Sequence, residues 1–417
     1  MMRPLHRAEV WSLAAVTTLA MSLSYVDRQT LSVLAPTITK ELGISDVGYG
    51  WLGAAFSIAY LAGGPVAGLW IDRVGARRGL LGAVVAWSAV AALQAAAPGL
   101  GGLVAIRLAL GLAESPTFPG GVQAVQRGLA EGDRARGMSL LFVGMAVGGM
   151  LAPPIANGIA GRFGWRAAFL GTAALAAAWT PLWLAVTSRP RVRAILDDGG
   201  KTEARPRPHG MLETAADPAM IRGIIGLLAI VPASAFAMAW ESKFYVRQFG
   251  LTQKGLTGYL VASAVAYDVG AVLFGDLAAR RERRRGHDRS PPRVLLACGA
   301  LLAATGLAGL AVAPDPQAAL VCFIASAAGR GAVVTLCNTD TLARVPRRAV
   351  STAGGVIASI QSLGAIVTNP LLGHAVQRLG YSPALAVLAA WTVPGTVAWL
   401  LLPAPAGAPA AFDARAT

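Results

Sequence analysis

The feature that most constrains this chain is a series of apolar runs, each long enough to cross a lipid bilayer. A transmembrane helix needs about 20 consecutive apolar residues. Such runs recur along all 417 residues, of which only 14% are charged, against roughly 25% in a soluble protein. The sequence therefore predicts an all-α membrane protein with twelve spans, which we place near residues 11–36, 49–71, 79–98, 101–126, 138–160, 165–187, 221–246, 255–279, 293–313, 317–342, 350–375 and 381–403.

The distribution of basic residues sets the expected orientation of these spans. With the N-terminus in the cytoplasm, cytoplasmic segments and the adjoining span ends hold 26 Lys and Arg residues, and outside loops and the adjoining span ends hold 6. This asymmetry follows the positive-inside rule, so the net charge of +15 orients the chain and does not indicate nucleic-acid binding. We expect both termini in the cytoplasm. The basic run "RRERRRGHDR" (280–289) is a candidate contact for anionic membrane lipid. The first run is too long, and too interrupted by charge, to be a cleaved signal peptide.

The chain divides into two halves that repeat each other. A Pro-, Arg- and Gly-rich cytoplasmic connection at 188–220 separates six spans in residues 1–187 from six in residues 221–417. "GMLAPPIANGIAGRFGW" aligns with "AIVTNPLLGHAVQRLGY" at an offset of 216, and "AYLAGGPVAGLWIDR" aligns with "AYDVGAVLFGDLAAR" at an offset of 207. Two six-helix bundles related by a pseudo-two-fold axis along the membrane normal resemble the architecture of major facilitator transporters.

The loop between the second and third spans carries a second resemblance. "GLWIDRVGARR" (68–78) resembles the facilitator loop motif. Gly68 is expected to let helices pack closely, and Gly75 to permit the tight turn. The resemblance implies that Asp72 holds the N-terminus of a neighbouring helix and favours an outward-open state. In the second copy Ala279 replaces that aspartate. The predicted conformational latch therefore consists of Gly68, Asp72, Arg73, Gly75 and Arg77.

Four charged residues lie deep within the first and fourth spans. Asp27 and Arg28 are adjacent in the first, while Arg107 and Glu114 are seven residues apart in the fourth. Seven residues are two helical turns, so the latter two share one face with roughly 10 Å of rise between them. They could form structural ion pairs, such as Asp27 with Arg107. Because intramembrane charge costs at least a few kcal/mol, we favour a functional role.

The chemistry of these residue types indicates how they can be coupled. A desolvated carboxyl group can bind and release a proton near neutral pH. An arginine keeps its charge and offers a planar fork that fits a carboxylate. An anionic ligand and the empty carboxylates then compete for the same arginines, so that protonation of one carboxylate frees an arginine for the anion.

Three stretches identify a branch of the family. "YVDRQTLSVLAPTITKELGIS", "RLALGLAESPTFPGG" and "FGWRAAF" resemble the anion:cation symporters, above all the bacterial hexuronate and sugar-acid transporters, over nearly the whole chain. The resemblance implies a monomeric inner-membrane carrier, without cofactor or metal, that takes up a small organic anion together with protons. It also implies that Asp27 and Glu114 carry the protons, and that Arg28 and Arg107 bind the substrate or couple the carboxylates. Tyr25 matches a cavity tyrosine of the same motif and is a further substrate-binding candidate.

The sequence departs from this branch in the seventh span. In "WESKFYV", Glu241 and Lys243 stand where relatives have apolar or proline residues. They are expected either to reach water from a helix end or to line the pocket. Arg330 in the tenth span is a further substrate-binding candidate, as is Asn369 on weaker grounds, and Asp268 has no assigned role. The extra charges leave the acid open between a sugar acid and another carboxylate, such as an aromatic acid.

Two rival functions compete with this expectation. A lysolipid or sphingolipid carrier resembling the spinster branch would share the Asp-Arg pair and the Arg/Glu spacing, but "PTFPGG" and "LSVLAPTITKELGIS" favour the sugar-acid branch. An enzyme or sensor is disfavoured because the four histidines are scattered, and neither Gly-x-Ser-x-Gly nor His-Glu-x-x-His occurs. The three cysteines all fall in predicted spans and are expected to be small buried hydrophobes.

Overall fold

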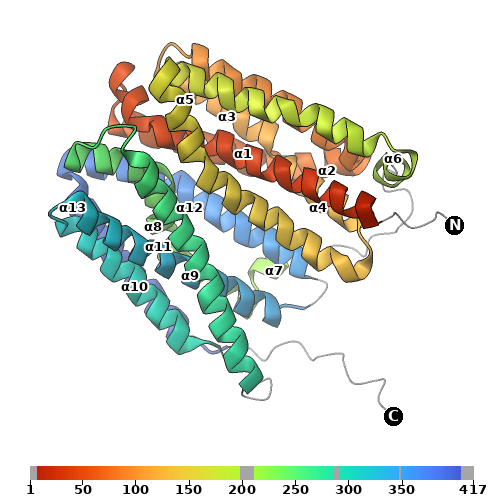
Figure 1. Ribbon diagram of the computed structural model, residues 1–417. Helices are drawn as coiled ribbons and strands as arrows, with labels where there is room; N and C mark the ends of the chain where they lie inside the picture. The colour runs from red at the N-terminus through yellow and green to blue at the C-terminus, as the bar shows by residue number, and fades with distance from the viewer. Residues whose placement is uncertain (1–6, 198–210, 285–290, 347–348, 405–417) are drawn as a thin grey trace. The chain divides into compact units, whose positions relative to one another are not determined.

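The computed structural model describes residues 7–197, 211–284, 291–346 and 349–404. Within these ranges every regular element is a helix, which confirms the all-α prediction (Figure 1). Nine of the described helices are long and apolar enough to cross a membrane. The elements are α1 (Arg7–Glu41), α2 (Asp46–Leu93), η1 (Gln94–Ala96), α3 (Leu100–Glu114), α4 (Thr117–Gly128), α5 (Glu131–Thr187), α6 (Pro190–Asp197), α7 (Met211–Ala215), α8 (Pro218–Phe249), α9 (Leu256–Arg284), α10 (Arg293–Val312), α11 (Pro316–Arg344), α12 (Val350–Leu379) and α13 (Tyr381–Leu401).

Two of the long helices are interrupted by a glycine in the left-handed region. Gly75 in α2 has φ 82°, and Gly164 in α5 has φ 83°. A side chain disfavours this conformation, so glycine is the residue that permits the break. Each glycine lies between two of the predicted spans. The fourth predicted span corresponds to two helices, α3 and α4, which meet at Ser115 and Pro116. The number of membrane crossings therefore stays a prediction.

The chain forms two compact units. The first contains residues 1–203 together with 238–264 and 369–377, and the second contains 204–237, 265–368 and 378–417. The first unit thus includes the ends of α8 and α9 and a short part of α12. The predicted division at 188–220 stays a prediction, and its residues 198–210 lie outside the described ranges, as do residues 285–289 of the basic run.

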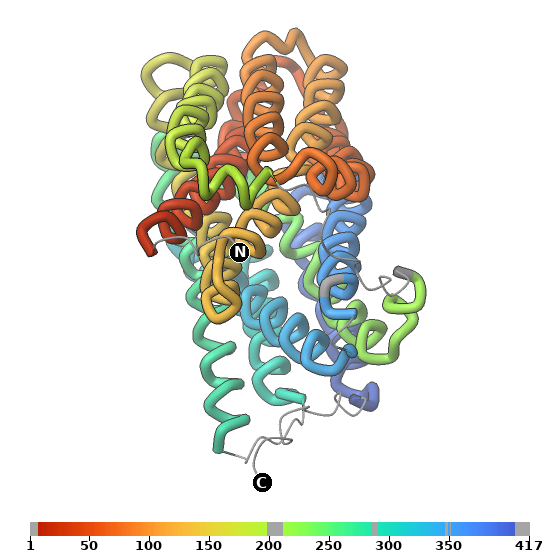
Figure 2. The backbone as a smooth tube through the Cα atoms, turned by 90° about the vertical axis from the view of Figure 1, so that its right-hand side faces the viewer, coloured from red at the N-terminus to blue at the C-terminus, as the bar shows by residue number. Residues whose placement is uncertain are grey.

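Tryptophan side chains and small residues hold the first unit together. α1 packs along α5 (Figure 1) and α2 along α3 (Figure 2). Trp179 and Trp183 stack with ring centroids 5.0 Å apart, and the Trp179 indole donates to the backbone oxygen of Val16 at 2.7 Å. A Cβ on Gly148 would clash with the backbone oxygen of Ser22. Such close approach of helix backbones fixes α1, which carries three of the predicted site residues.

The second unit is built on a different set of helices. α10 packs against α11 and α13. Phe236 and Phe323 stack with centroids 6.0 Å apart, and a Cβ on Gly306 would lie 2.5 Å from the backbone nitrogen of Ser326. Small residues again let helix backbones approach closely. In a bilayer no hydrophobic force drives helices together, because lipid tails are as apolar as the side chains, so close packing takes its place.

The loop motif packs against a helix from the predicted connection. A Cβ on Gly75 would lie 2.5 Å from the backbone oxygen of Leu196 in α6, so the turn needs glycine for space as well as for its φ. Arg77 donates from Nε to the backbone oxygen of Thr187 at 3.2 Å, and its Nη1 lies 3.5 Å from Asp197 Oδ2. The turn expected at Gly75 is therefore confirmed.

The remaining residues of the motif differ from expectation in one respect. The close packing expected at Gly68 is wrong, because a Cβ there would meet nothing within 4 Å. Asp72 accepts a hydrogen bond from Gln123 Nε2 of α4 at 3.1 Å, and Arg73 is exposed. The proposed hold of Asp72 on a helix N-terminus stays a prediction.

Candidate functional site

A buried ion pair joins α1 to the end of α3. Glu114, the last residue of α3, is fully buried. Its Oε2 accepts hydrogen bonds from Arg28 Nη2 at 2.9 Å, from Arg28 Nε at 3.3 Å and from Ser24 Oγ at 3.0 Å. Its Oε1 has no hydrogen-bond partner among the described residues. Among the described residues, one oxygen of this carboxylate therefore carries all of its hydrogen bonds and the other carries none.

Three aromatic rings surround the Arg28 guanidinium. Its Cζ lies 4.8 Å from the ring centroid of Tyr25, 4.8 Å from that of Phe56 and 4.7 Å from that of Tyr60. Rings at these distances attract a cation through their negative faces. Arg28 is therefore a partly buried cation whose charged partner is Glu114.

Arg107 also lies beside the Phe56 ring. Its Cζ is 4.8 Å from the Phe56 ring centroid, so one ring contacts two guanidinium groups. Arg107 is 4% exposed, and within the described ranges neither its Nε nor its Nη1 has a hydrogen-bond partner. A buried guanidinium with unsatisfied donors is costly, and a bound carboxylate would supply the missing acceptors.

Asp27 lies apart from both arginines. It is 1% exposed, and neither carboxylate oxygen makes a hydrogen bond of ordinary length to a described residue. Thr172 and Trp87 are the polar side chains beside it, and Glu114 is close enough to act on it electrostatically. The structural alternative in which Asp27 pairs with Arg107 is therefore not formed.

The two other substrate-binding candidates have separate surroundings. Asn369 belongs to the first unit, where its Oδ1 accepts a hydrogen bond from the Trp240 indole at 3.1 Å. Arg330 belongs to the second unit, is 4% exposed and lies with its Cζ 5.7 Å from the ring centroid of Tyr267. The grouping of Arg330 with the first-unit residues stays a prediction.

The unusual charges of α8 do not reach water. Lys243 is buried and bonds Asp46 Oδ1 at 2.7 Å, and Glu241 is buried and accepts from Ser263 Oγ at 2.7 Å. The alternative of a helix end extending into solvent is therefore wrong. Asp46 lies in the first turn of α2. The sequence did not predict its role, because a charged residue just outside a predicted span is ordinarily expected to face water.

Sequence reasoning also missed the aromatic rings and one buried charged cluster. Phe56 and Tyr60 are four residues apart, a spacing that places them on one helix face. In the second unit, Asp340 binds Arg222 through Oδ2, and Arg344 through Oδ1 at 2.8 and 3.0 Å. Arg222 also donates to the backbone oxygen of Trp399 at 3.2 Å. These charges fall near predicted span ends, where water-facing groups are the ordinary expectation.

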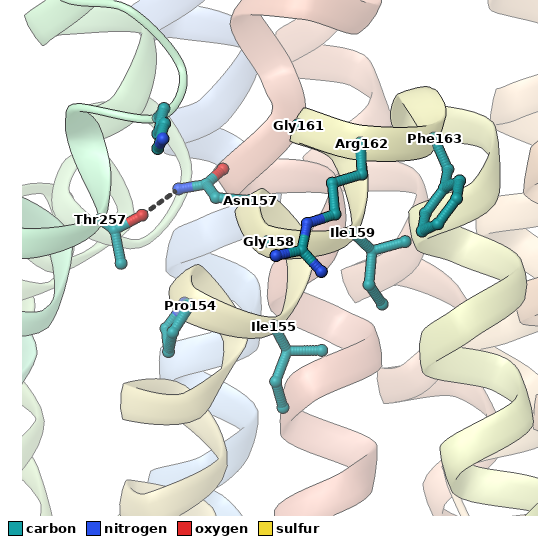
Figure 3. Close-up of a pocket in the computed structure, with 10 residues that line it drawn as sticks. Pro154, Ile155, Asn157, Gly158, Ile159, Gly161, Arg162, Phe163 and Thr257 are labelled. Carbon is teal, nitrogen blue, oxygen red and sulfur yellow. Dashed lines mark hydrogen bonds between the residues drawn. The ribbon is translucent and has the colours of Figure 1, made fainter.

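A cavity of about 740 Å³ lies along α5, away from these charges. Figure 3 shows the Arg162 guanidinium near Gly158 and Ile159 of the same helix. In the same view the Asn157 amide donates to Thr257 Oγ1 at 2.9 Å. Neither of the two proposed proton carriers lines this cavity, nor does Arg28 or Arg107. This cavity therefore does not mark the buried charged site.

Comparison with known proteins settles the family. The model of the Major Facilitator Superfamily matches residues 17–286, well over half of the chain. The chain belongs to the Major Facilitator Superfamily. As a facilitator with several long apolar helices, it is a multi-pass membrane protein.

Relatives of this facilitator include transporters of sugar acids. It is 28% identical to the hexuronate transporter of Escherichia coli (strain K12) over 408 residues, which cover 94% of each chain. It is 28% identical to the D-galactonate transporter of Escherichia coli O6:H1 over 403 residues, covering 91% of this chain and 92% of the relative. Its fold matches an inward-facing, unoccupied bacterial homologue of the human lysosomal transporter Spinster, with a TM-score of 0.78, 19% identity and 95% coverage of each chain.

Proposed function

We propose that the protein carries a small organic anion, of the hexuronate or sugar-acid class, across the inner membrane together with protons. The sugar-acid transporters among its relatives support the substrate class. The observation that carries the proposal is the buried group in the first unit. There Arg28 pairs with Glu114, while Arg107 and Asp27 lack hydrogen-bond partners on the atoms described above.

The ion pair supplies a coupling step. When Glu114 binds a proton, its Oε2 loses the charge that holds Arg28. Arg28 and Arg107, which share the Phe56 ring, are then two cations that can receive the carboxylate of an incoming anion. When the proton leaves, Glu114 competes for Arg28 again and displaces the anion. Asp27 is the second proton carrier in this scheme, and Tyr25 closes one face of the anion site.

The charges in this group explain why protons are needed. Asp27, Glu114, Arg28 and Arg107 sum to zero when ionised, so a bound anion adds an uncompensated negative charge. Two protons per monoanion make the loaded carrier net positive, and the membrane potential then contributes about 2.3 kcal/mol per 100 mV. Each pH unit across the membrane adds about 1.4 kcal/mol per proton. Both gradients therefore drive the anion inward.

The finer topology is part of the proposal. We infer that α2 and α5 each cross the membrane twice, at either side of Gly75 and Gly164, and that α3 and α4 make one crossing. With α8 to α13 and α1 this gives twelve crossings and places both termini in the cytoplasm. Movement of the two bundles against each other would then expose the binding site to one side of the membrane at a time. We also infer that the carrier acts as a monomer. Arg330 and Asn369 are proposed to contact the part of the acid remote from its carboxylate, Asn369 after release from Trp240.

Uptake by purified protein in liposomes tests the proposal. D-galacturonate, D-galactonate, D-glucarate and an aromatic acid are supplied outside, with and without an inward proton gradient. We expect accumulation of at least one acid above its outside concentration, only with the gradient, and collapse on addition of a protonophore. Accumulation that persists after the protonophore would exclude proton coupling.

A lysolipid arm tests the rival cargo. The likeness to the Spinster homologue is at 19% identity and concerns the fold alone, so it does not assign a lipid substrate. Competition by lysophosphatidylcholine is therefore expected to leave acid uptake unchanged. Transport of the lysolipid with no uptake of any acid would overturn the proposed substrate class.

A further inference from the structure

Segments from the second half of the chain seal one end of α1, α2 and α5 within the first unit. The Tyr49 hydroxyl donates to the backbone oxygen of Ala239, and the Ser242 hydroxyl donates to that of Ser32. Gln253 Nε2 donates to the backbone oxygen of Val33 at 2.7 Å. These contacts join α8, and the loop that follows it, directly to α1 and α2.

Two further contacts complete the seal. The backbone nitrogen of Val47 donates to Gln377 Oε1 of α12 at 3.3 Å. Gln253 also donates to Asn157 Oδ1 at 2.8 Å, and Asn157 in turn donates to Thr257 (Figure 3). Under the proposed topology, this end of the bundle faces the outside. We call this end the outer mouth, and the contacts above close it in this structure.

The strongest interaction at this mouth is a carboxylate held by two cations. Asp46 Oδ1 lies 2.7 Å from Lys243 Nζ, and Asp46 Oδ2 lies 2.6 Å from Arg247 Nη1. The Lys243 ammonium is 4.7 Å from the ring centroid of Tyr49 and 5.6 Å from that of Trp240. Each carboxylate oxygen thus has its own cation, and one cation is flanked by aromatic rings.

The origin of the three charges distinguishes this cluster from an ordinary ion pair. Asp46 comes from α2, whereas Lys243 and Arg247 both come from α8, four residues apart. When the mouth opens, Asp46 stays with α2 and both cations stay with α8. Like charges four residues apart on one helix face repel each other, so the open state leaves a dication that an anion would stabilise.

We propose that Lys243 and Arg247 form a capture site for the carboxylate of the transported acid at the outer mouth, and that Asp46 occupies this site when the mouth is closed. This inference rests on the proposed function. The Asp46 carboxylate then acts as an internal competitor: an acid that binds the two cations keeps Asp46 from returning, and passes inward from a site that is already matched to its charge.

Opposite changes in affinity test the capture site. Initial rates of uptake are measured in intact cells, with the acid that the wild-type protein carries, for Asp46→Asn, Lys243→Gln and Arg247→Gln. All three variants loosen the mouth, but only the last two remove a ligand for the acid. We expect KM to fall several-fold in Asp46→Asn and to rise about tenfold in Lys243→Gln, the size of one lost charge-assisted hydrogen bond. If KM changes in the same direction in both variants, the cluster only holds the mouth closed and does not bind the acid, and the proposal is overturned.

A matched control is provided by another carboxylate–arginine pair. Glu41 of α1 pairs with Arg166 and accepts from the Trp165 indole at 2.7 Å, entirely within α1 and α5. Because opening the mouth does not separate these helices from each other, Glu41→Gln is expected to leave KM unchanged. A fall in KM matching that of Asp46→Asn would assign the effect to surface charge and overturn the proposal.

A second readout does not depend on transport. The three native cysteines, Cys298, Cys322 and Cys337, are first replaced. The variant Ser32→Cys is then labelled from outside with an impermeant maleimide. Both Asp46→Asn and Lys243→Gln should speed the labelling. D-galacturonate, D-galactonate or D-glucarate should then slow it in Asp46→Asn, but not in the double variant Asp46→Asn/Lys243→Gln. Failure of all three acids to protect Asp46→Asn would overturn the capture site, whereas protection without uptake would overturn the proposed transport alone.

Discussion

Three buried carboxylates of this protein differ in how fully their charge is satisfied. Asp340 in the second unit binds Arg222 through one oxygen and Arg344 through the other. Glu114 in the first unit binds Arg28 and Ser24 through Oε2 alone. Neither oxygen of Asp27 has a hydrogen-bond partner among the residues described. All three are at least nine-tenths buried, so exposure does not separate them.

The difference indicates what each group is for. A buried carboxylate with both oxygens paired to cations has its hydrogen-bonding capacity met by the protein. A buried carboxylate with an unsatisfied oxygen destabilises the folded protein. Such a group is usually retained because the protein's function needs it. This contrast agrees with the proposal that Glu114 and Asp27 carry protons, and it favours a structural role for Asp340.

Breaking the Asp340 cluster should have the largest effect. Asp340→Asn leaves the Arg222 guanidinium, which is 2% exposed, without its full counter-charge. Removing one partner of a buried ion pair costs about 3–5 kcal/mol, so we expect a large fall in the melting temperature of detergent-purified protein and little protein in the membrane. The exposed pair Asp276–Arg280, on α9, is the control. Because solvent screens that pair, Asp276→Asn should cost at most about 1 kcal/mol.

Changing Glu114 should affect proton coupling, whereas changing Asp340 should affect stability. Glu114→Gln keeps the shape and hydrogen bonding of the side chain but cannot release a proton. We expect accumulation against a gradient to fall to background, while exchange of labelled for unlabelled acid persists because exchange does not require the proton to leave. Both assays are run on one purified sample. Undiminished uphill accumulation would remove Glu114 from the proton pathway.

Asp27 offers the sharpest contrast with Asp340. Since neither Asp27 oxygen has a hydrogen bond of ordinary length to lose, Asp27→Asn should hardly lower the melting temperature, whereas the same change at Asp340 should lower it strongly. Gradient-driven uptake should nevertheless fall to a small fraction of the wild-type rate. A melting temperature that drops as far as in Asp340→Asn would show that Asp27 is structural.

The sequence predicted the membrane-spanning class, the turn at Gly75 and the identity of the buried charges, because periodicity, glycine and charge in apolar runs are local signals. It did not predict which charges pair. The Arg28–Glu114 pair joins residues 86 positions apart, and the choice between Arg28 and Arg107 depends on how α1 and α3 pack. Asp46, Arg222 and Asp340 were missed because a charge near a span end is ordinarily expected to face water, and only tertiary packing buries it.

Arg107 should affect affinity more than stability. Arg107→Lys keeps the charge but replaces the planar fork with a single ammonium group. We expect KM for the transported acid to rise about tenfold, the loss expected for one charge-assisted hydrogen bond, with the melting temperature nearly unchanged. Arg28→Lys is the comparison, because Arg28 already bonds Glu114 and its replacement should lower both affinity and stability. Wild-type KM in Arg107→Lys would assign Arg107 to structure.

The smallest effect is expected at Phe56, whose ring lies 4.8 Å from the Cζ of both Arg28 and Arg107. Phe56→Leu keeps apolar volume beside the two guanidinium groups but removes the electron-rich ring that stabilises them. A cation–π contact is worth about 0.5–1 kcal/mol at partly solvated sites, so KM should rise about threefold with unchanged proton dependence. Phe118→Leu is the control, since Phe118 pairs with Phe142 at 6.0 Å and contacts neither arginine in the described structure. If Phe56 merely fills space, both leucine variants will leave KM at the wild-type value. If the ring instead holds the two cations at the spacing that a carboxylate requires, only Phe56→Leu will raise it, and tyrosine at this position will restore it.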